Sequence, residues 1–110
     1  MRPIPKSMLI HSGTITGVTT TDRWGNETTT PPVDLKFIRI EPTTKIVKDK
    51  QNNEIQLSNL MFYDCKNSLP KGATFNEDTV ITINGKEHTI KVIDKLYDEN
   101  KLHHYELGLI

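Results

Sequence analysis

The fold of this chain is decided by residues 79–95, which read TVITINGKEHTIKVIDK. Apolar and polar residues alternate on both sides of Asn84-Gly85, and such alternation is typical of strands with one buried face. Asn-Gly between two alternating runs favours a type I′ turn, because both central residues of that turn need a positive φ. The stretch therefore predicts an antiparallel hairpin.

The sequence after this hairpin predicts one more strand. A polar turn at residues 98–101 is followed by alternation through His103, Tyr105, Leu107 and Leu109. Three successive antiparallel strands form a meander, and with the preceding strands it can close into a small structure whose edges are hidden. We therefore expect an all-β fold: a small antiparallel β-barrel or sandwich with a C-terminal three-strand meander and long loops.

The upstream sequence also favours strands. Threonine, isoleucine and valine dominate it, and β-branched residues favour pleated surfaces. Strands are predicted at residues 8–18, 33–41 and 60–66. Residues 19–32 are polar and contain Gly and Pro, so a long loop is expected there.

A bulge is predicted inside the strand at residues 33–41. Leu35 and Phe37 share one face, and the apolar phase then moves to Ile38 and Ile40. A phase change of one residue turns side chains to the other face unless an extra residue is inserted, so we expect a bulge near Phe37.

The sequence allows two interpretations for each of two segments. Trp24 stands in the polar stretch, where an indole either packs back on the domain or meets a partner. Residues 43–57 consist of two short strand-like arms around a polar turn, DKQNN at 49–53, which predicts either a hairpin or a mobile loop.

Length and charge restrict the function classes. A chain of 110 residues is expected to form one domain, residues 1–110. It has 14 basic and 14 acidic residues, so its net charge is zero with neutral histidines. That balance argues against a dedicated nucleic-acid binder, which needs a basic surface, and it is compatible with self-association. No apolar run approaches the roughly 20 residues of a membrane helix.

No catalytic motif is found in the sequence. Cys65 is the only cysteine and has no adjacent base, so a reduced structural thiol is expected. His103 and His104 should point to opposite faces of a strand, whereas a cross-strand pair of His88 with one of them is compatible with the meander. No carboxylate or cysteine cluster accompanies them. We expect no enzyme activity, catalytic residues, cofactor or metal.

A lysine-bearing segment is the main candidate for contact with another molecule. Residues 36–50 contain five basic and two acidic side chains, which suits either a solvated loop or a surface that meets DNA or a partner's acidic residues. The candidate contact residues are Lys45, Lys48, Lys50 and Trp24.

Several fragments of the chain carry a resemblance through their order and spacing. They are RPIPK at residues 2–6, LIHS at 9–12, EPTTKIV at 41–47, NEIQL at 53–57, FYDC at 62–65, INGKE at 83–87, KLYDE at 95–99 and LHHYELG at 102–108. Together they resemble the minor capsid proteins encoded by phages and prophages of Gram-positive bacteria, over nearly the whole chain except residues 19–32.

The resemblance implies a structural virion protein of a tailed phage or prophage, made in the cytoplasm of the bacterial host. It implies a subunit of the neck that joins head to tail, similar to the stopper proteins that close the portal channel after DNA packaging. The implied partners are other neck proteins on the portal or adaptor side and on the tail side, copies of the chain in a ring and incidentally packaged DNA, with no membrane.

Two other function classes are alternatives to a virion protein. A small nucleic-acid-binding β-barrel is the main alternative, but it should carry several aromatic residues on one strand face beside a basic groove. A small hydrolase is less favoured, because the motifs of that chemistry are missing.

Overall fold

The computed structural model describes residues 2–17, 19–49 and 51–110. In this part of the chain the only helical element is a single 3-10 turn, η1 (Lys6–Met8), so the all-β prediction is confirmed. The strands are β1 (His11–Ile15), β2 (Thr19–Thr21), β3 (Glu27–Thr29), β4 (Val33–Pro42), β5 (Ile46–Lys48), β6 (Glu54–Gln56), β7 (Asn59–Asp64), β8 (Val80–Ile83), β9 (Lys86–Asp98) and β10 (Lys101–Leu109).

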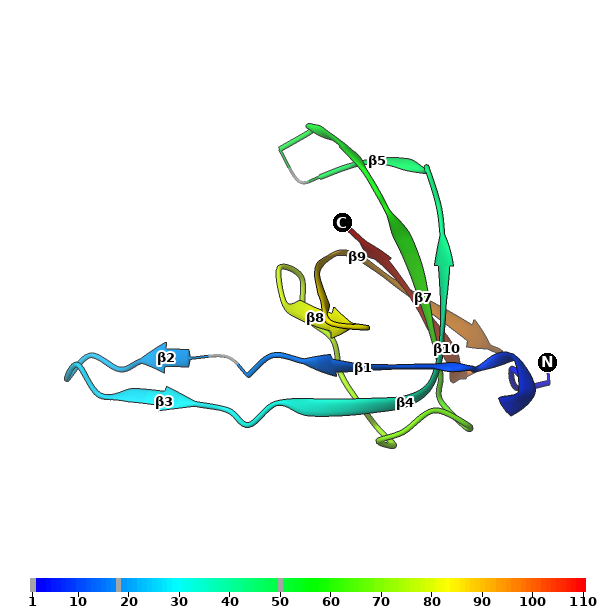
Figure 1. The fold of residues 1–110 in the computed structure, drawn as a ribbon, viewed down its shortest axis with the longest axis horizontal. Helices are drawn as coiled ribbons and strands as arrows, with labels where there is room; N and C mark the ends of the chain where they lie inside the picture. The colour runs from blue at the N-terminus through cyan, green and yellow to red at the C-terminus, as the bar shows by residue number, and fades with distance from the viewer. Residues whose placement is uncertain (1, 18, 50) are drawn as a thin grey trace.

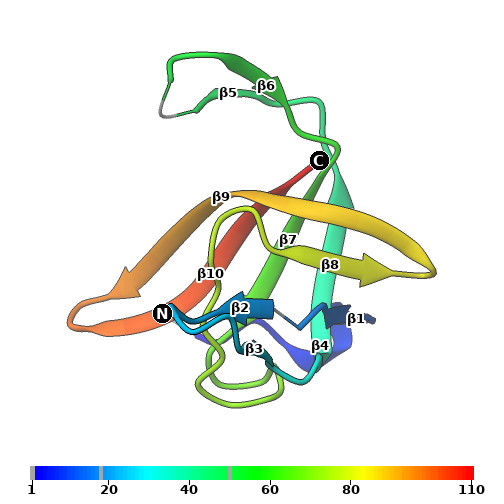
Figure 2. The same cartoon turned by 90° about the vertical axis from the view of Figure 1, so that its left-hand side faces the viewer.

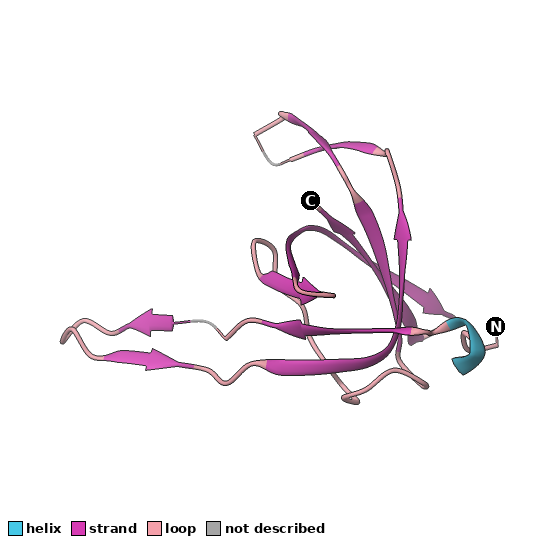
Figure 3. Cartoon of the chain, viewed as in Figure 1, coloured by secondary structure: helices cyan, strands magenta, loops and turns pink. Residues whose placement is uncertain are grey.

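A closed antiparallel barrel forms the body of the molecule (Figures 1 and 3). Its strands are ordered β1-β4-β7-β10-β9-β8, and β8 returns to β1 through the pairs Thr14 with Thr82 and Ile15 with Ile81. The sequence predicted either a barrel or a sandwich, and the chain forms the barrel. Closure removes the open edges that an unrolled sheet would expose.

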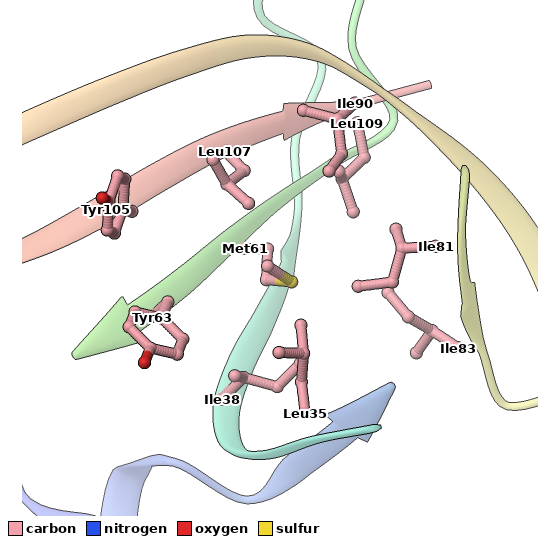
Figure 4. Close-up of a cluster of buried hydrophobic side chains, with 10 residues drawn as sticks. All are labelled: Leu35, Ile38, Met61, Tyr63, Ile81, Ile83, Ile90, Tyr105, Leu107 and Leu109. Atoms are coloured by element: carbon pink, nitrogen blue, oxygen red, sulfur yellow. The ribbon is translucent and has the colours of Figure 1, made fainter. Parts of the chain in front are cut away.

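The barrel interior is filled by side chains from β4, β7, β8, β9 and β10 (Figure 4). On β10, Tyr105, Leu107 and Leu109 all point inward, as the alternation predicts. An edge-to-face cluster of Tyr63, Phe75 and Tyr105 is part of this packing, with ring centroids 5.0 to 5.9 Å apart. The buried cluster contains Leu35, Ile38, Met61, Tyr63, Ile81, Ile83, Ile90, Tyr105, Leu107 and Leu109.

The predicted bulge lies at Phe37. Its φ is 58°, and the pairing of β1 with β4 shifts there, since His11 is opposite Ile38 while Ser12 is opposite Lys36. The extra residue lets Leu35 and Ile38, three positions apart, both face the core at 0% exposure.

The C-terminal meander is confirmed as β8-β9-β10. Asn84 and Gly85 have φ values of 52° and 75°, as a type I′ turn requires, and Ile83 pairs with Lys86. The long strands β9 and β10 then pair from Lys101 with Asp98 to Leu109 with Ile90.

Two upstream predictions need correction. The strand expected at residues 8–18 is limited to β1, because Met8 belongs to the turn η1, and Val18 lies outside the described residues. The loop expected at residues 19–32 is instead largely a hairpin in which β2 pairs with β3. The β preference of its threonines prevails over the Gly and Pro signals, which only mark the turn and the end of the hairpin.

Residues 43–57 form a hairpin, which is one of the two interpretations of this segment. Ile46 pairs with Gln56, Val47 with Ile55 and Lys48 with Glu54. The two hairpins β2-β3 and β5-β6 each form a separate two-stranded sheet outside the barrel.

Candidate assembly surface

Two hairpin arms project from the barrel (Figures 1 and 2). The β2-β3 arm, residues 19–29, continues β1 and β4 along the long axis of the molecule, and the β5-β6 arm, residues 46–56, connects β4 to β7. Both are two-stranded ribbons, and an isolated ribbon is only marginally stable in water. Such arms are suited to contacts with other molecules.

The tip of the β2-β3 arm is a turn organised by Asp22. The backbone N–H groups of Trp24 and Asn26 donate to Asp22 Oδ1 over 2.8 and 2.9 Å, and Gly25 N–H donates to Asp22 O over 3.1 Å. The Asn26 backbone N–H, followed by smaller contributions from Trp24 and the Asn26 side chain, holds the pKa of Asp22 below its usual value. Gly25 has a φ of 84°, the conformation that closes this hairpin type.

The tip of the β5-β6 arm has the same hydrogen-bond pattern. The backbone N–H groups of Gln51 and Asn53 donate to Asp49 Oδ1 over 2.9 and 2.8 Å, and Asn52 N–H donates to Asp49 O over 3.0 Å. Asn52, at the position of the glycine in the other tip, has a φ of 65°. The sequences DRWGN and DKQNN thus encode the same turn, in which an Asp accepts from the second and fourth residues after it.

Trp24 is 72% exposed at the tip of the β2-β3 arm. The guanidinium of Arg23 lies over its ring, 4.4 Å from the centroid, as a cation–π pair. Of the two interpretations of this indole, packing back on the domain is therefore excluded. Contact with a partner stays a prediction.

The base of the β5-β6 arm is fastened to the barrel. Leu57 is 2% exposed and packs on Gly108, where a Cβ atom would lie 2.7 Å from Leu57 Cδ1. Ser58 donates to the carbonyl of Leu109 from its backbone N–H over 2.7 Å and from Oγ over 3.2 Å. The arm is thus positioned by close packing at its base, although Ile46 is 59% exposed.

A groove of about 420 Å³ separates the β5-β6 arm from β9. On the β9 side of the groove Lys91 pairs with Asp78, with 2.7 Å between Nζ and Oδ1. This hydrogen bond is the main cause that raises the pKa of Lys91, and the nearby Asp49 and Glu77 carboxylates add to it. The lining is Lys48, Asp49, Gln51, Ile55, Glu77, Asp78, Lys91, Val92 and Ile93.

The four predicted contact residues do not form one surface. Lys48 lines the groove, Lys45 is exposed at the base of the β5-β6 arm, and Lys50 lies outside the described residues. Trp24 is at the tip of the other arm, which points in a different direction (Figure 1). Their separation follows from the placement of the two arms on the barrel, which the sequence does not display.

Sequence reasoning missed the role of Asp64. Its carboxylate is buried and accepts three backbone N–H bonds, from Ile4 over 3.0 Å, Lys66 over 3.1 Å and Asn67 over 2.9 Å. Asn67 also donates its side-chain amide to Ile4 O over 2.7 Å. The N-terminal arm, residues 2–5, is thereby held against the end of β7 in its own chain. The only signal in the sequence was a carboxylate, Asp64, within an otherwise apolar strand.

The histidines are arranged differently from the prediction. The register places His88 opposite Ile81, and His104 opposite Leu96, so the cross-strand pairing of His88 with His103 or His104 that the sequence allowed does not occur. A bulge at His103 instead brings the two adjacent rings together, with 2.7 Å between their Nδ1 atoms.

His103, which contacts His104, also binds the N-terminal arm. His103 Nε2 donates to Arg2 O over 2.7 Å, because a carbonyl can only accept. Within residues 2–17, 19–49 and 51–110, no group of three or more His, Cys, Asp or Glu side chains is placed to hold a metal.

Cys65 is half-buried with a free thiol. Burial, reinforced by the neighbouring Asp64 carboxylate, raises the pKa of this thiol. Its thiolate is therefore disfavoured, which is the opposite of what a nucleophile needs. The described residues contain no helix that is long and apolar enough to cross a membrane.

Fold and surface together define a small antiparallel β-barrel protein with two projecting hairpin arms. Comparison with protein families then gives a match to the family described as minor capsid protein, over residues 5–109. The chain belongs to this family, so the resemblance found in the sequence is confirmed and the chain is a phage structural protein located in the virion. Comparison with curated proteins and with solved structures gave no significant match.

Proposed function

We propose that this chain is a non-enzymatic subunit of the phage neck, which joins head to tail and closes the portal channel after DNA packaging. Copies form a ring beneath the portal or adaptor protein, and the ring's opposite face receives the tail. The observation that carries the proposal is a rigid barrel with two projecting arms in a member of the minor capsid family.

The division between barrel and arms supports a ring. A ring subunit needs a body that keeps its shape and extensions that reach its neighbours, since each copy must contact two others through different surfaces. The barrel supplies the body through its apolar interior. The arms supply exposed two-stranded sheets outside the barrel, and such strands can add to a partner's sheet.

The β5-β6 arm is proposed to meet the channel. Lys45, Lys48 and Lys50 give it positive charge, and in a ring the copies of this arm would surround the axis, where packaged DNA passes. Lysines at this place would attract DNA phosphates or a neighbour's carboxylates. Trp24, on the other arm, is proposed to contact a neighbouring subunit.

The exposed aromatic residues argue against the alternative of a nucleic-acid-binding barrel. Trp24, Phe37 and Tyr97 lie on the β2-β3 turn, β4 and β9, so these rings do not line one strand as a base-stacking platform does.

Deletion of the gene from the phage tests the proposal. We expect heads that package DNA but lose it or fail to acquire tails, as seen by electron microscopy of the lysate and by nuclease sensitivity of the packaged DNA. Expression of the intact chain from a plasmid should restore complete virions. A deletion lysate full of normal tailed particles contradicts the neck function.

Replacement of residues 49–53 by a short Gly-Ser linker tests the channel role separately. The barrel should fold unchanged, because the arm's base is held by Leu57 and Ser58 and not by its tip. We expect DNA to leak from tailless heads that carry this variant. If heads with this variant retain DNA as well as heads with the intact chain, the β5-β6 arm does not take part in channel closure.

A further inference from the structure

A second groove, of about 490 Å³, lies beside η1, the cyan turn in Figure 3. Its lining comes from residues 6–12 and 36–37, which all belong to the described part of the chain. Ile10 is 68% exposed there and Phe37 is 36% exposed, and Leu69, on the loop that pairs with β4, is exposed beside them. Exposed apolar side chains that gather in one place are typical of a surface that meets another protein.

Phe37 holds a backbone conformation that its side chain does not favour. Its φ of 58° is in the left-handed region, which is rare for a bulky residue and which glycine or asparagine adopts at lower cost. The bulge serves the core through Leu35 and Ile38, and Phe37 is not part of the core cluster. The fold therefore gives no reason for an aromatic residue at this position, whereas contact with a partner does.

The lining of this groove is basic. Lys6 and Lys36 are exposed lining residues, and the Lys6 ammonium lies 4.9 Å from the centroid of the Phe37 ring. His11 accepts the backbone N–H of Ile40 at Nδ1 over 3.1 Å, so its Nε2 carries a proton and is a further donor. None of the described residues that line the groove is acidic.

The acidic residues of β4 leave this positive charge in excess. Glu41 is paired with Arg39, with 2.7 Å between Oε1 and Nε, so the two side chains together add no net charge. Asp34 lines the adjoining groove with Lys36 and accepts from Thr14 Oγ1 over 3.0 Å. Since Asp34 balances at most one of the two lysines, the groove keeps a positive excess and is complementary to an acidic partner.

An acidic protein segment fits the groove better than DNA or a second copy does. A DNA duplex offers phosphates to the lysines but no apolar side chain to cover Ile10 and Phe37. A second copy would offer Trp24, the most exposed large apolar residue in the described part of the chain. The Arg23 guanidinium lies over that ring, so its positive charge would meet the charge of the lysines.

We infer that the groove formed by Lys6, Ile10, Lys36 and Phe37 binds an acidic segment of another virion protein. An apolar side chain of that segment covers Ile10 and Phe37, and its carboxylates lie at the two lysines. The inference goes beyond the proposed neck function because it gives the chemistry of a partner. It rests on the virion location that the family shows and not on channel closure.

Chemical cross-linking of intact virions tests the identity of the partner. A water-soluble carbodiimide joins a lysine amine to a carboxylate in contact with it, and mass spectrometry of the digested product identifies both residues. We expect Lys6 or Lys36 to be joined to an Asp or Glu of a different virion protein. Products confined to copies of this chain, or no product at either lysine, would overturn the inference.

Phe37→Asn separates the partner contact from the fold. Asparagine adopts the required φ at lower cost, so urea denaturation should give a free energy of unfolding at least equal to that of the intact chain. In phage whose gene deletion is complemented with this variant, the cross-linked product per particle should fall by about tenfold or more, because the partner loses its contact with the ring. A stable variant with an undiminished product would contradict the inference.

Charge reversal gives a second test that does not depend on the bulge. Lys36→Glu should reduce the product formed at Lys6, and Lys6→Glu should reduce the product formed at Lys36, because each change repels the acidic segment. The matched control is Lys95→Glu, an exposed residue of β9 outside the groove, which should leave both products unchanged. Undiminished products in both reversals would also overturn the inference. The gene deletion described above judges the neck function independently.

Discussion

The barrel and the arms are made of similar residues but differ in what their strands bury. In β10 alternate residues from Tyr105 to Leu109 enter the core, whereas all residues of β3 are exposed. Both segments are extended and paired, so local preference and hydrogen bonds suffice to form strands in either place. Only the barrel adds the burial of apolar area, which is the dominant favourable contribution to folding. The comparison separates a stable body from arms whose order depends on further contacts.

The largest expected difference between the two regions is in amide exchange. Protection in β9 and β10 should approach the global free energy of unfolding, about 5–15 kcal/mol for a domain, because their opening requires the barrel to unfold. Residues 43–57 should exchange far faster in the free subunit and become protected in the assembled neck. Exchange measured by NMR on the monomer tests this. Equal protection of the arm and the residues of β9 would make the arm part of the rigid body.

Truncation of a core side chain should have the next largest effect. Leu107→Ala removes a fully buried side chain and is expected to destabilise the protein by about 2–5 kcal/mol. Ile46→Ala, on the exposed part of the β5-β6 arm, is the matched control and should change stability by less than about 0.5 kcal/mol. Urea denaturation measures both. Similar losses would mean that the arm shares the core's stability.

The junction of arm and barrel should give an intermediate effect. Gly108→Ala places a methyl group against Leu57, and such overpacking costs about 1–3 kcal/mol. In a Leu57→Ala background the same change should cost less, because the two contacts with Leu57 are removed and only that with Val92 Cβ at 3.1 Å remains. A double-mutant cycle by urea denaturation measures this coupling. Additive losses of stability would show that the Leu57 side chain does not limit the space for a side chain at residue 108.

The smallest effect is expected at the tip of the β2-β3 arm. The folded-state pKa of Asp22 is lowered, so the carboxylate's stabilisation of the turn is present above its unfolded pKa of about 3.9 and is lost as the pH falls through the folded value. The amide resonances of Trp24 and Asn26 should move with that titration.

In Asp22→Asn these shifts should disappear while the resonances of β10 stay unchanged. An NMR titration between pH 6 and 2 checks both outcomes. If Asp22 titrates at its unfolded pKa, the hydrogen bonds of the turn do not stabilise its carboxylate.

Much of the fold could be predicted because its signals are local. Asn84-Gly85 specified a turn from the φ values its residues tolerate, and the phase change after Phe37 specified a bulge from side-chain alternation alone. The same local logic applied to the β2-β3 arm would have found its hairpin. DRWGN carries the Asp-to-Asn turn chemistry of DKQNN, although the polar composition of residues 19–32, with Gly and Pro, predicts a loop.

The sequence by itself determined the class of fold, the meander and the family, because alternation, turn residues and the order of motifs are written along the chain. Tertiary structure decided how the barrel closes, where His103 bulges, how Asp64 holds the N-terminal arm, and that Trp24 and Lys48 belong to different arms. These features depend on which residues of distant strands face each other. That register is set by packing of the whole core, and no single segment contains it.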